Sequence, residues 1–500
     1  MNDTTFDYII VGAGTAGCLL ANRLSADASK RVLLIEAGKR DDYHWIHIPV
    51  GYLYCIGNPR TDWLYQTEAA PGLNGRSLRY PRGKVLGGCS SINGMIYMRG
   101  QSRDYDQWAN ITGDANWQWE KCLPYFKFHE DHYKGATPLH GEKGVLPELL
   151  QTGNAQDDHS TDYFKVLKAR QAGGEWRIDK QRLSWDVLES FSKAAQQAGL
   201  PSTSDFNQGN NEGVGYFDVN QKNGWRWNTA QAFLRPTCYA RPNFELWTQA
   251  QVAGLVIETG ADGLKRCTGV KVWDGHQLLT ATAKREVALS AGSIGSAHIL
   301  QLAGIGNAQS LHDKGVAVTH DLPGVGANLQ DHLQIRSVYK VKNAKTLNTL
   351  ANSWWGKAKI GLEYAMSRSG PMSMAPSQLG AFTKSSPEHA WPNIQYHVQP
   401  LSLDAFGEPL HNFPAITASV CNLNPTSRGS VSLKSADFND APAIAPNYLS
   451  TDEDRKVAAD SLRVTRRIMS QAAMAPYAPE EYKPGVQYQT DEELALLAGD

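Results

Sequence analysis

The sequence predicts an α/β protein that opens with a parallel sheet crossed by a helix. Residues Phe6–Val11 and Arg31–Ile35 are short runs rich in Val, Ile and Leu, as expected of parallel strands buried on both faces. Between them, Gly12, Gly14 and Gly17 precede a stretch in which leucines recur at helical spacing. A strand, a glycine turn, a helix and a second strand form one right-handed β-α-β unit, which predicts a Rossmann-like nucleotide-binding domain.

Composition narrows the function classes. The chain has 500 residues, enough for two or three domains, and its net charge of -1 gives no electrostatic basis for binding nucleic acid. The seven cysteines form no C-x-x-C pair, so we predict neither a disulfide framework nor a metal site. Reduced, widely spaced thiols are typical of a cytoplasmic enzyme, and no apolar run approaches the roughly 18 residues that a membrane-spanning helix needs.

The glycine turn has the features of a dinucleotide site. Gly12 permits the tight turn, Gly14 lets the backbone approach a pyrophosphate, and Gly17 lets helix and strand pack closely. The helix that follows offers unpaired N–H groups and a positive dipole end to phosphates. Glu36 ends the second strand and would accept hydrogen bonds from ribose hydroxyls, which disfavours a cofactor with a 2′-phosphate. The pattern alone leaves both NAD and FAD open.

The chain after Gly38 is harder to assign. Residues 38–150 are rich in Gly, Pro, Trp and Tyr with little periodicity, and we expect long irregular segments there. Within them, Gly87 and Gly88 lie in a second glycine-rich stretch, residues 81–94, whose bare backbone can lie flat against a planar ligand or a diphosphate. The later elements expected are a helix over 184–198, strands within 244–272 broken by a turn at 260–263, a strand over 286–289, a helix over 296–302, and strands over 394–398 and 416–420.

Several ordered blocks resemble one family. Besides the two glycine segments, these blocks are Gly292–Gly306, Leu322–His332 and Pro446–Ser450. Together the blocks resemble the glucose–methanol–choline (GMC) flavoprotein oxidoreductases, and most closely the bacterial choline dehydrogenase-like and alcohol dehydrogenase members. Ala297 and Ala303 depart from the family pattern, where Pro and Ser are usual, and both look like packing changes.

The resemblance implies a Rossmann-like FAD-binding domain joined to a mixed α+β substrate domain built on an antiparallel sheet. We expect the FAD-binding domain over residues 1–332, with irregular cap segments at about 40–150, the substrate domain over 333–450, and a C-terminal helical segment over 451–500. The cofactor residues implied are Gly12, Gly14, Gly17, Glu36, Val85, Gly87, Gly88, Asn93, Gly94, Met95, Ile96, Val252 and Gly292.

The resemblance also bears on attachment and substrate. Relatives that bind FAD covalently carry a His where this chain has Ile92, so we expect FAD to be non-covalent. His397 would be the catalytic residue that hydrogen-bonds the reacting oxygen, although a core histidine is an equally good interpretation. Gln334 and Gln378 would contact substrate. Choline-oxidising relatives carry Glu at the position of Gln334, and its absence weakens the case for a cationic substrate.

The C-terminal end lacks an expected segment. In the family, a His-Pro-Val-Gly type segment near the C-terminus carries the main catalytic His, and no such segment occurs here. Thr490 has the features of a helix N-cap, and the helix after it stops at Asp500. We therefore expect the chain to be truncated and the catalytic segment to lie beyond Asp500.

These inferences predict an FAD-dependent enzyme that oxidises a primary alcohol to an aldehyde by hydride transfer to flavin N5, with oxygen or a quinone as electron acceptor. The alternative is a hydroxynitrile lyase-like enzyme, which keeps FAD without net redox chemistry. A flavin-binding remnant and an NAD-dependent dehydrogenase are weaker alternatives. We expect a cytoplasmic protein, with peripheral contact at the inner membrane left open by quinone-reducing relatives, although no amphipathic anchor stands out.

Overall fold

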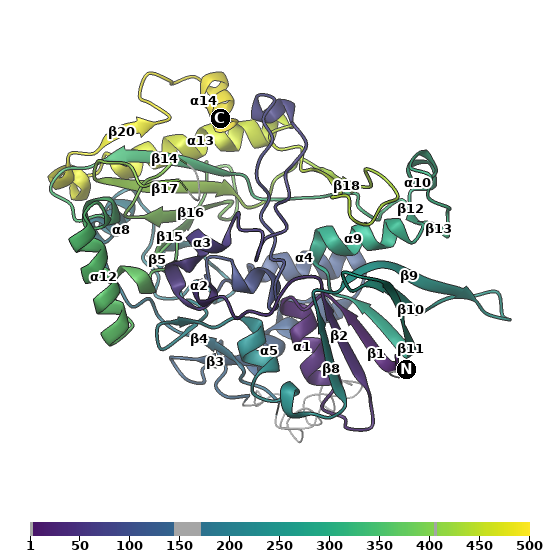
Figure 1. Ribbon diagram of the computed structural model, residues 1–500. Coiled ribbons are helices and arrows are strands. Elements are labelled where there is room, and N and C mark those ends of the chain that lie inside the picture. The colour runs from purple at the N-terminus through teal and green to yellow at the C-terminus, as the bar shows by residue number, and fades with distance from the viewer. Residues whose placement is uncertain (1–3, 145–171, 405–407) are drawn as a thin grey trace.

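The chain folds around two large sheets, seen at the right and left of Figure 1 in a computed structural model that describes residues 4–144, 172–404 and 408–500. The first sheet has the strand order β8-β2-β1-β11-β10-β9, with β8, β2, β1 and β11 parallel and the β11-β10-β9 part antiparallel. Its strands are β1 (Thr5–Val11), β2 (Val32–Glu36), β8 (Phe244–Thr248), β9 (Gln251–Thr259), β10 (Lys265–Trp273) and β11 (Leu278–Leu289).

Both faces of the central strands are buried, which explains their continuous apolar sequence. In β1, Ile10 packs with the helix α1 (Thr15–Leu24), whereas Ile9 and Val11 pack on the opposite face with Val252 and Val270. The predicted β-α-β unit is therefore confirmed. The turn at 260–263 also forms as expected, since Gly263 donates its N–H to Gly260 O at 2.9 Å.

The expectation of irregular structure after Gly38 was wrong for two segments. Helices α4 (Ser102–Thr112) and α5 (Trp119–His129) lie there, and the last residues of that range, 145–150, fall outside the described residues. The N-terminus of α4 is closed by a capping box in which the Gln101 side chain accepts from the N3 backbone and the Asp104 carboxylate accepts from Gln101 N–H. Helix α5 contains Pro124 in its interior. Because proline usually interrupts a helix, the sequence did not indicate one there.

The second sheet is antiparallel throughout, with strand order β20-β14-β17-β16-β15-β5. Its strands are β5 (Gly213–Tyr216), β14 (Gln334–Lys340), β15 (Leu379–Thr383), β16 (Ile394–Gln399), β17 (Ala415–Asn422) and β20 (Glu480–Lys483). The largest apolar core lies between one face of this sheet and the helices α8 (Asp186–Gln197) and α13 (Asp452–Met469).

The expected domain limits stay a prediction, but sheet membership does not follow them. The edge strands β5 and β20 of the second sheet come from outside residues 333–450. Conversely, β18 (Ser430–Ser432) lies within that range but packs against α9 (Gly292–Leu302), which belongs to the expected FAD-binding domain. Val431 of β18 and Ile294 of α9 belong to one buried apolar cluster, which makes that link.

The remaining elements are short or peripheral. The helices are α2 (His44–His47), α3 (Tyr52–Cys55), α10 (Ala308–Asp313), α11 (Leu347–Ala351), α12 (Trp354–Ser367) and α14 (Asp491–Ala498). The strands are β3 (Glu130–His132), β4 (Trp176–Ile178), β6 (Gln221–Lys222), β7 (Trp225–Arg226), β12 (Ile305–Gly306), β13 (His320–Asp321) and β19 (Ala443–Ala445). As predicted, Thr490 caps α14. Among the described residues, no helix combines the length and apolarity needed to cross a bilayer.

Candidate functional site

A cavity of about 840 Å³ opens at the carboxyl ends of β1 and β2. This is where open α/β sheets bind ligands. Its walls come from Gly12, residues 14–16, residues 35–37, residues 82–84, residues 88–89, residues 250–252, residues 289–296 and residues 438–442, with Trp63 and Tyr65. Of the predicted cofactor residues, it is lined by Gly12, Gly14, Glu36, Gly88, Val252 and Gly292.

The two glycine segments touch each other at this cavity. Gly87 donates its backbone N–H to Ala13 O at 2.8 Å, which ties the second segment to the first turn. A Cβ added to Gly88 would lie 2.7 Å from the Cα of Gly14, and one added to Gly12, at φ +96°, would lie 2.6 Å from Ser290 O. Side chains at these positions would therefore overlap neighbouring backbone of the protein itself, so only glycine lets these segments approach one another this closely beside the cavity.

Two helix N-termini face the same cavity. Gly14 precedes α1 and Ala291 precedes α9; neither has a side-chain cap, and neither helix has an acidic residue in its first turn. Unpaired N–H groups and the positive dipole ends thus remain available to an anion. This donor set fits a diphosphate.

Glu36 is the last residue of β2 and lies beside the glycine turn. Its carboxylate, only 6% exposed, accepts from Ala13 N–H at 3.0 Å and from Gly38 N–H at 2.8 Å. Burial raises the pKa of Glu36 to about 7, against the effect of these two backbone donors and of Lys84. The remaining lone pairs of the carboxylate face a cavity in which a hydroxyl donor would complete the hydrogen bonding.

Other predicted cofactor residues lie behind or beside this cavity. Gly17 packs against Gly12 O, where a Cβ would overlap that oxygen, as its predicted role in close helix–strand packing requires. Val85 is buried with Ile92 in a small apolar cluster, and Met95 with Val219 in another. Gly87 does not line the cavity, but its N–H bonds Ala13 O of the first glycine turn. The segment Asn93–Ile96 continues from the second glycine stretch, and Asn93 is exposed.

Arg226, which the sequence analysis did not single out, contacts this segment. Its fully buried guanidinium donates from Nη1 to Asn93 Oδ1 at 2.9 Å and to Ser90 O at 3.1 Å. Its Nε and Nη2 have no hydrogen-bond partner among the described residues. Burial lowers the pKa of Arg226 to about 10, so the side chain stays charged at neutral pH. A buried cation with unpaired donors calls for an acceptor beside Asn93.

The antiparallel sheet presents a polar face opposite its apolar core. In β16, Ile394, Tyr396 and Val398 are fully buried in the core. Because side chains alternate along a strand, Gln395, His397 and Gln399 lie on the other face. Across the sheet, His397 is paired with Ser419 of β17 and with Gly380 of β15, and its ring lies 5.4 Å from that of Phe217.

His397 is electrically neutral in this setting. Burial is the main cause that lowers the pKa of His397 to about 4, and the nearby His332 adds to the effect. The imidazole therefore offers one acceptor and one donor nitrogen above that pH. His397 does not line the 840 Å³ cavity, which belongs to the glycine segments.

The two predicted substrate residues differ in their surroundings. Gln334 is exposed at the start of β14, where it pairs with Cys421. Gln378 is fully buried before β15, and its Nε2 donates to Leu183 O at 3.3 Å while Oε1 lacks a partner among the described residues. Contact of either residue with substrate stays a prediction.

Comparisons with known proteins identify the family. The N-terminal and C-terminal sequence profiles described as GMC oxidoreductase match residues 6–334 and 425–498. The chain belongs to the GMC oxidoreductase family. It is 37% identical over 492 residues to the alcohol dehydrogenase [acceptor] of Pseudomonas putida, covering 98% of this chain and 82% of that protein. It is 38% identical over 489 residues to the oxygen-dependent choline dehydrogenase of Vibrio vulnificus, covering 98% and 81%.

A solved structure agrees with this assignment. The FAD-dependent oxidoreductase of Chaetomium thermophilum superimposes with a TM-score of 0.81 and 25% identity, covering 99% of this chain and 87% of that one. The prediction of an FAD-binding GMC oxidoreductase that acts on CH–OH donors is thereby confirmed at the level of the family. The residues present fit FAD, because the glycine cradle, the two helix N-termini and Glu36 together suit a dinucleotide.

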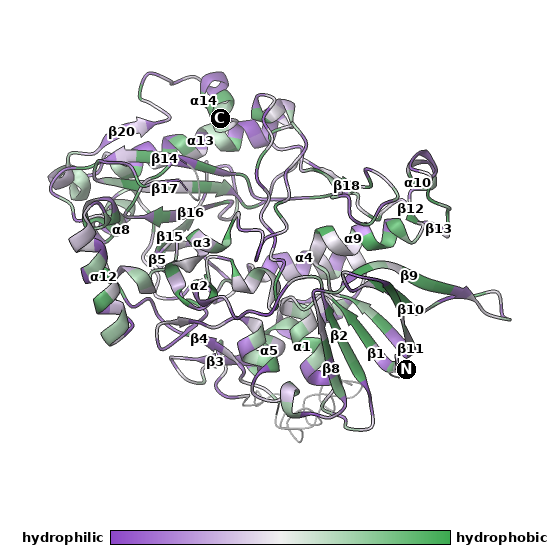
Figure 2. Ribbon diagram, in the orientation of Figure 1, coloured by the Kyte–Doolittle hydropathy of each residue, from purple (hydrophilic) through white to green (hydrophobic). Residues whose placement is uncertain are grey.

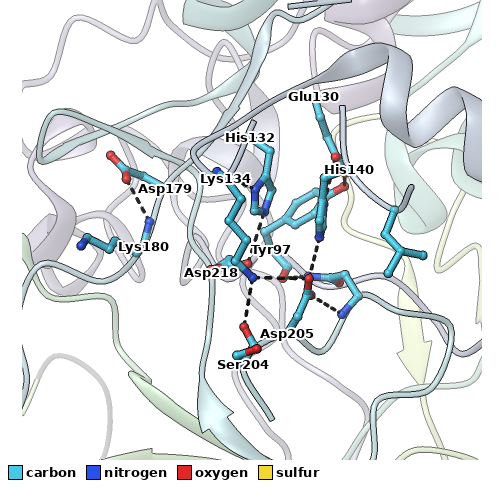
Figure 3. Close-up of polar contacts among 12 residues, drawn as sticks. Tyr97, Glu130, His132, Lys134, His140, Asp179, Lys180, Ser204, Asp205 and Asp218 are labelled. Carbon is cyan, nitrogen blue, oxygen red and sulfur yellow. Dashed lines mark hydrogen bonds and ion pairs between the residues drawn. The ribbon is translucent and has the colours of Figure 1, made fainter. Parts of the chain in front are cut away.

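A buried charge network anchors the segment that follows Asn93–Ile96 in this GMC oxidoreductase. Figure 3 shows His140 between Glu130 and Asp205. Its Nδ1 lies 3.2 Å from Glu130 Oε2 and its Nε2 lies 2.7 Å from Asp205 Oδ2, so both nitrogens donate when the ring is protonated. Glu130 also accepts from the Tyr97 hydroxyl and the Arg99 guanidinium. The carboxylates on both sides raise the pKa of His140 despite its burial.

Proposed function

We propose that this GMC oxidoreductase oxidises a primary alcohol to an aldehyde, with non-covalently bound FAD as the oxidant and oxygen or a quinone as the final electron acceptor. The observation that carries the proposal is the placement of both glycine segments at one dinucleotide-sized cavity, with a polar sheet face in the second half of the chain. On that face β16 and β17 carry no charged side chain, and Arg336 of β14 pairs with Ser419. Support also comes from relatives named alcohol dehydrogenase and choline dehydrogenase.

The polar sheet face suits a neutral alcohol. Gln395, Gln399 and Ser419 offer hydrogen-bond donors and acceptors without a formal charge, and Phe217 supplies an apolar contact beside His397. A cationic ammonium would lose its hydration there without gaining an anionic partner on these strands. We therefore favour aliphatic or aromatic alcohols over choline.

His397 would orient the substrate hydroxyl. With its pKa lowered to about 4, the ring is neutral at pH 7 and one nitrogen can accept the hydroxyl hydrogen bond. That contact draws electron density onto the oxygen and aims the adjacent C–H bond. Bound FAD supplies the two-electron acceptor for the hydrogen of that C–H bond. Arg226 would hold Asn93 in place and keep a positive charge near the bound ring system.

Nothing in the side chain at position 92 can attach FAD covalently, because Ile92 carries only hydrocarbon. We therefore propose that FAD is held by hydrogen bonds and packing alone.

Anaerobic mixing of the flavin-loaded full-length protein with an alcohol series tests the proposal. The oxidised-flavin absorbance should bleach with primary alcohols and much less with choline. His397→Ala should slow bleaching by about 10²–10⁴-fold, within the range expected for loss of a proton-transfer group. Bleaching by no alcohol of the series would contradict the proposed reaction, and cyanide release from a hydroxynitrile without bleaching would favour lyase chemistry instead.

A further inference from the structure

Helix α12 presents an apolar face to solvent. Its inner side packs on the protein through Tyr364, which is 3% exposed and donates its hydroxyl to Gly224 O at 2.9 Å. Its outer side carries four large apolar side chains, Trp354, Trp355, Leu362 and Met366, which are 65%, 69%, 61% and 80% exposed. Figure 2 shows α12 at the margin of the molecule, with green segments along the helix.

The apolar face is continuous. With successive residues about 100° apart around a helix, six apolar residues fall within an arc of about 120° opposite Tyr364. They are Trp354, Ala365, Ala358, Leu362, Trp355 and Met366. Lys359 lies at one border of this arc and Lys357 about 60° beyond the other, and both are exposed. An amphipathic helix normally turns such a face toward the core, so an outward apolar face of this size marks an interaction surface.

The charge around α12 identifies the kind of partner. Residues 342–368 contain five Lys or Arg residues and one Glu, a net charge of +4 in a chain whose net charge is -1. A second copy of the chain would bring the same positive charge against itself. An anionic lipid surface complements it, because basic side chains bind the headgroups while Trp, Leu and Met enter the boundary with the acyl chains.

We propose that the outer face of α12 docks the protein on the surface of an anionic phospholipid membrane. Trp at this depth is typical of membrane interfaces, where its ring is apolar and its N–H stays hydrated. Docking is a surface contact, since no helix of the described residues is suited to cross a bilayer. It stands on the geometry and charge of α12 and does not depend on the proposed reaction.

Docking would also bring the proposed site near the membrane. Arg368, just after α12, places its guanidinium 4.4 Å from the ring centre of Trp225, and Tyr364 bonds the preceding Gly224. The next residue, Arg226, holds Asn93 of the cofactor segment. Only a short stretch of chain thus separates the docking face from that segment.

Vesicle flotation with the flavin-loaded full-length protein tests the proposal. We expect the protein to float with vesicles of phosphatidylcholine and phosphatidylglycerol, to stay behind with pure phosphatidylcholine, and to be released by high salt. The double variant Leu362→Glu with Met366→Glu should weaken binding at least tenfold. Lys357→Glu with Lys359→Glu should weaken it by about 25-fold or more, since each basic residue near an anionic surface contributes about fivefold.

Ile111→Glu is the matched control, because Ile111 is 74% exposed on α4 and far along the chain from α12. This variant should bind anionic vesicles as the parent does. Flavin absorbance of each variant verifies that the fold is intact. Absence of binding to anionic vesicles, or equal binding by the Leu362→Glu and Met366→Glu variant, would overturn the proposal. A concentration-dependent dimer that this variant abolishes, without vesicle binding, would assign the face to a second copy instead.

Discussion

The buried carboxylate of Glu36 is destabilised by the loss of water and stabilised by the groups that donate hydrogen bonds to it. Its two carboxylate oxygens each accept one backbone N–H, from Ala13 and from Gly38, so the anionic form is the one that fits the turn. Desolvation opposes this and raises the pKa of Glu36 to about 7. A ligand hydroxyl that donates to the carboxylate shifts the balance back toward the anion, and FAD binding should therefore be linked to this proton.

Replacing Glu36 by Gln should weaken FAD binding. An amide has one acceptor oxygen, so its NH₂ group must face either Ala13 N–H or Gly38 N–H, donor against donor. We expect a loss of about 1–3 kcal/mol in binding free energy, roughly 5- to 150-fold in Kd. In the parent protein, Kd should also rise as pH falls through about 7, and this dependence should vanish in Glu36→Gln.

Titration of the apoprotein with FAD at several pH values measures both effects. Glu258→Gln, an exposed substitution on β9, is the matched control and should bind as the parent does. Equal Kd values for Glu36→Gln and the parent across pH 5–9 would remove Glu36 from the cofactor site.

At the scale of elements, the network around β3 holds the cofactor segment against the rest of the chain. His140 lies between Glu130 and Asp205, stacks on His132 at 3.8 Å between ring centres, and reaches Tyr97 and Arg99 through Glu130. Lys134 and Asp218 border it, the former 3.4 Å from Asp205 and the latter 3.4 Å from His132. The charges are buried, so their balance matters more than at a surface.

His140→Gln should destabilise the fold in a pH-dependent way. Removing the cation between two buried carboxylates should cost about 3 kcal/mol of unfolding free energy. The raised pKa of His140 makes its contribution full below its ordinary value of 6.5 and lost as pH rises through the folded value. The pKa of Glu130, lowered to about 2, makes its contribution full above 4.5 and lost as pH falls toward 2. The difference between parent and variant should be greatest between about pH 4.5 and 6.5.

Denaturant unfolding at pH 5.5 and pH 9, followed by far-UV circular dichroism, measures this difference. The exposed His276→Gln in the turn between β10 and β11 is the control, and it should match the parent at both pH values. An effect of His140→Gln that is the same at both pH values would point to packing alone.

How far sequence predicts an element depends on whether its pattern is local. The strands β1 and β2 were predicted to within one residue at each end, and the helix α1 was predicted between them, because the glycine turn and buried apolar runs determine these elements. In contrast, β11 extends to Leu278, although only 286–289 was expected, because the earlier part of the strand carries exposed residues such as Lys284 and its first residues, 278–281, pair with β10 alone. Helix α4 was missed because few of its residues are buried.

At the scale of the whole molecule, the unpredicted features are those that join distant parts of the chain. No local pattern says that β5 pairs with β15, or that Arg226 reaches Asn93. The glycine pattern and the resemblance together predicted the cofactor residues, and their contact with FAD stays a prediction. The polar face with His397 could be recognised only in the structure, where alternate residues of β16 enter the core. The outward face of α12 was also missed, because exposure distinguishes it from an ordinary apolar helix only in the fold.

The walls of the cavity come from segments that lie far apart along the sequence, so bound FAD should stabilise these segments together. Its walls come from the first glycine turn, the second glycine segment, the start of α9 and residues 438–442. Acid precipitation should release FAD into the supernatant, as expected for non-covalent binding at Ile92. Yellow colour retained in the pellet would contradict non-covalent binding.

Returning FAD to apoprotein at about 100 times its Kd should add about 2.7 kcal/mol to the unfolding free energy. Thermal melts at rising FAD concentration should then shift upward by a few degrees, and hydrogen exchange should slow in residues 83–94 and 289–296 while the hairpin tip at 260–263 stays unchanged. Protection confined to the first turn would mean that the two glycine segments do not share one ligand.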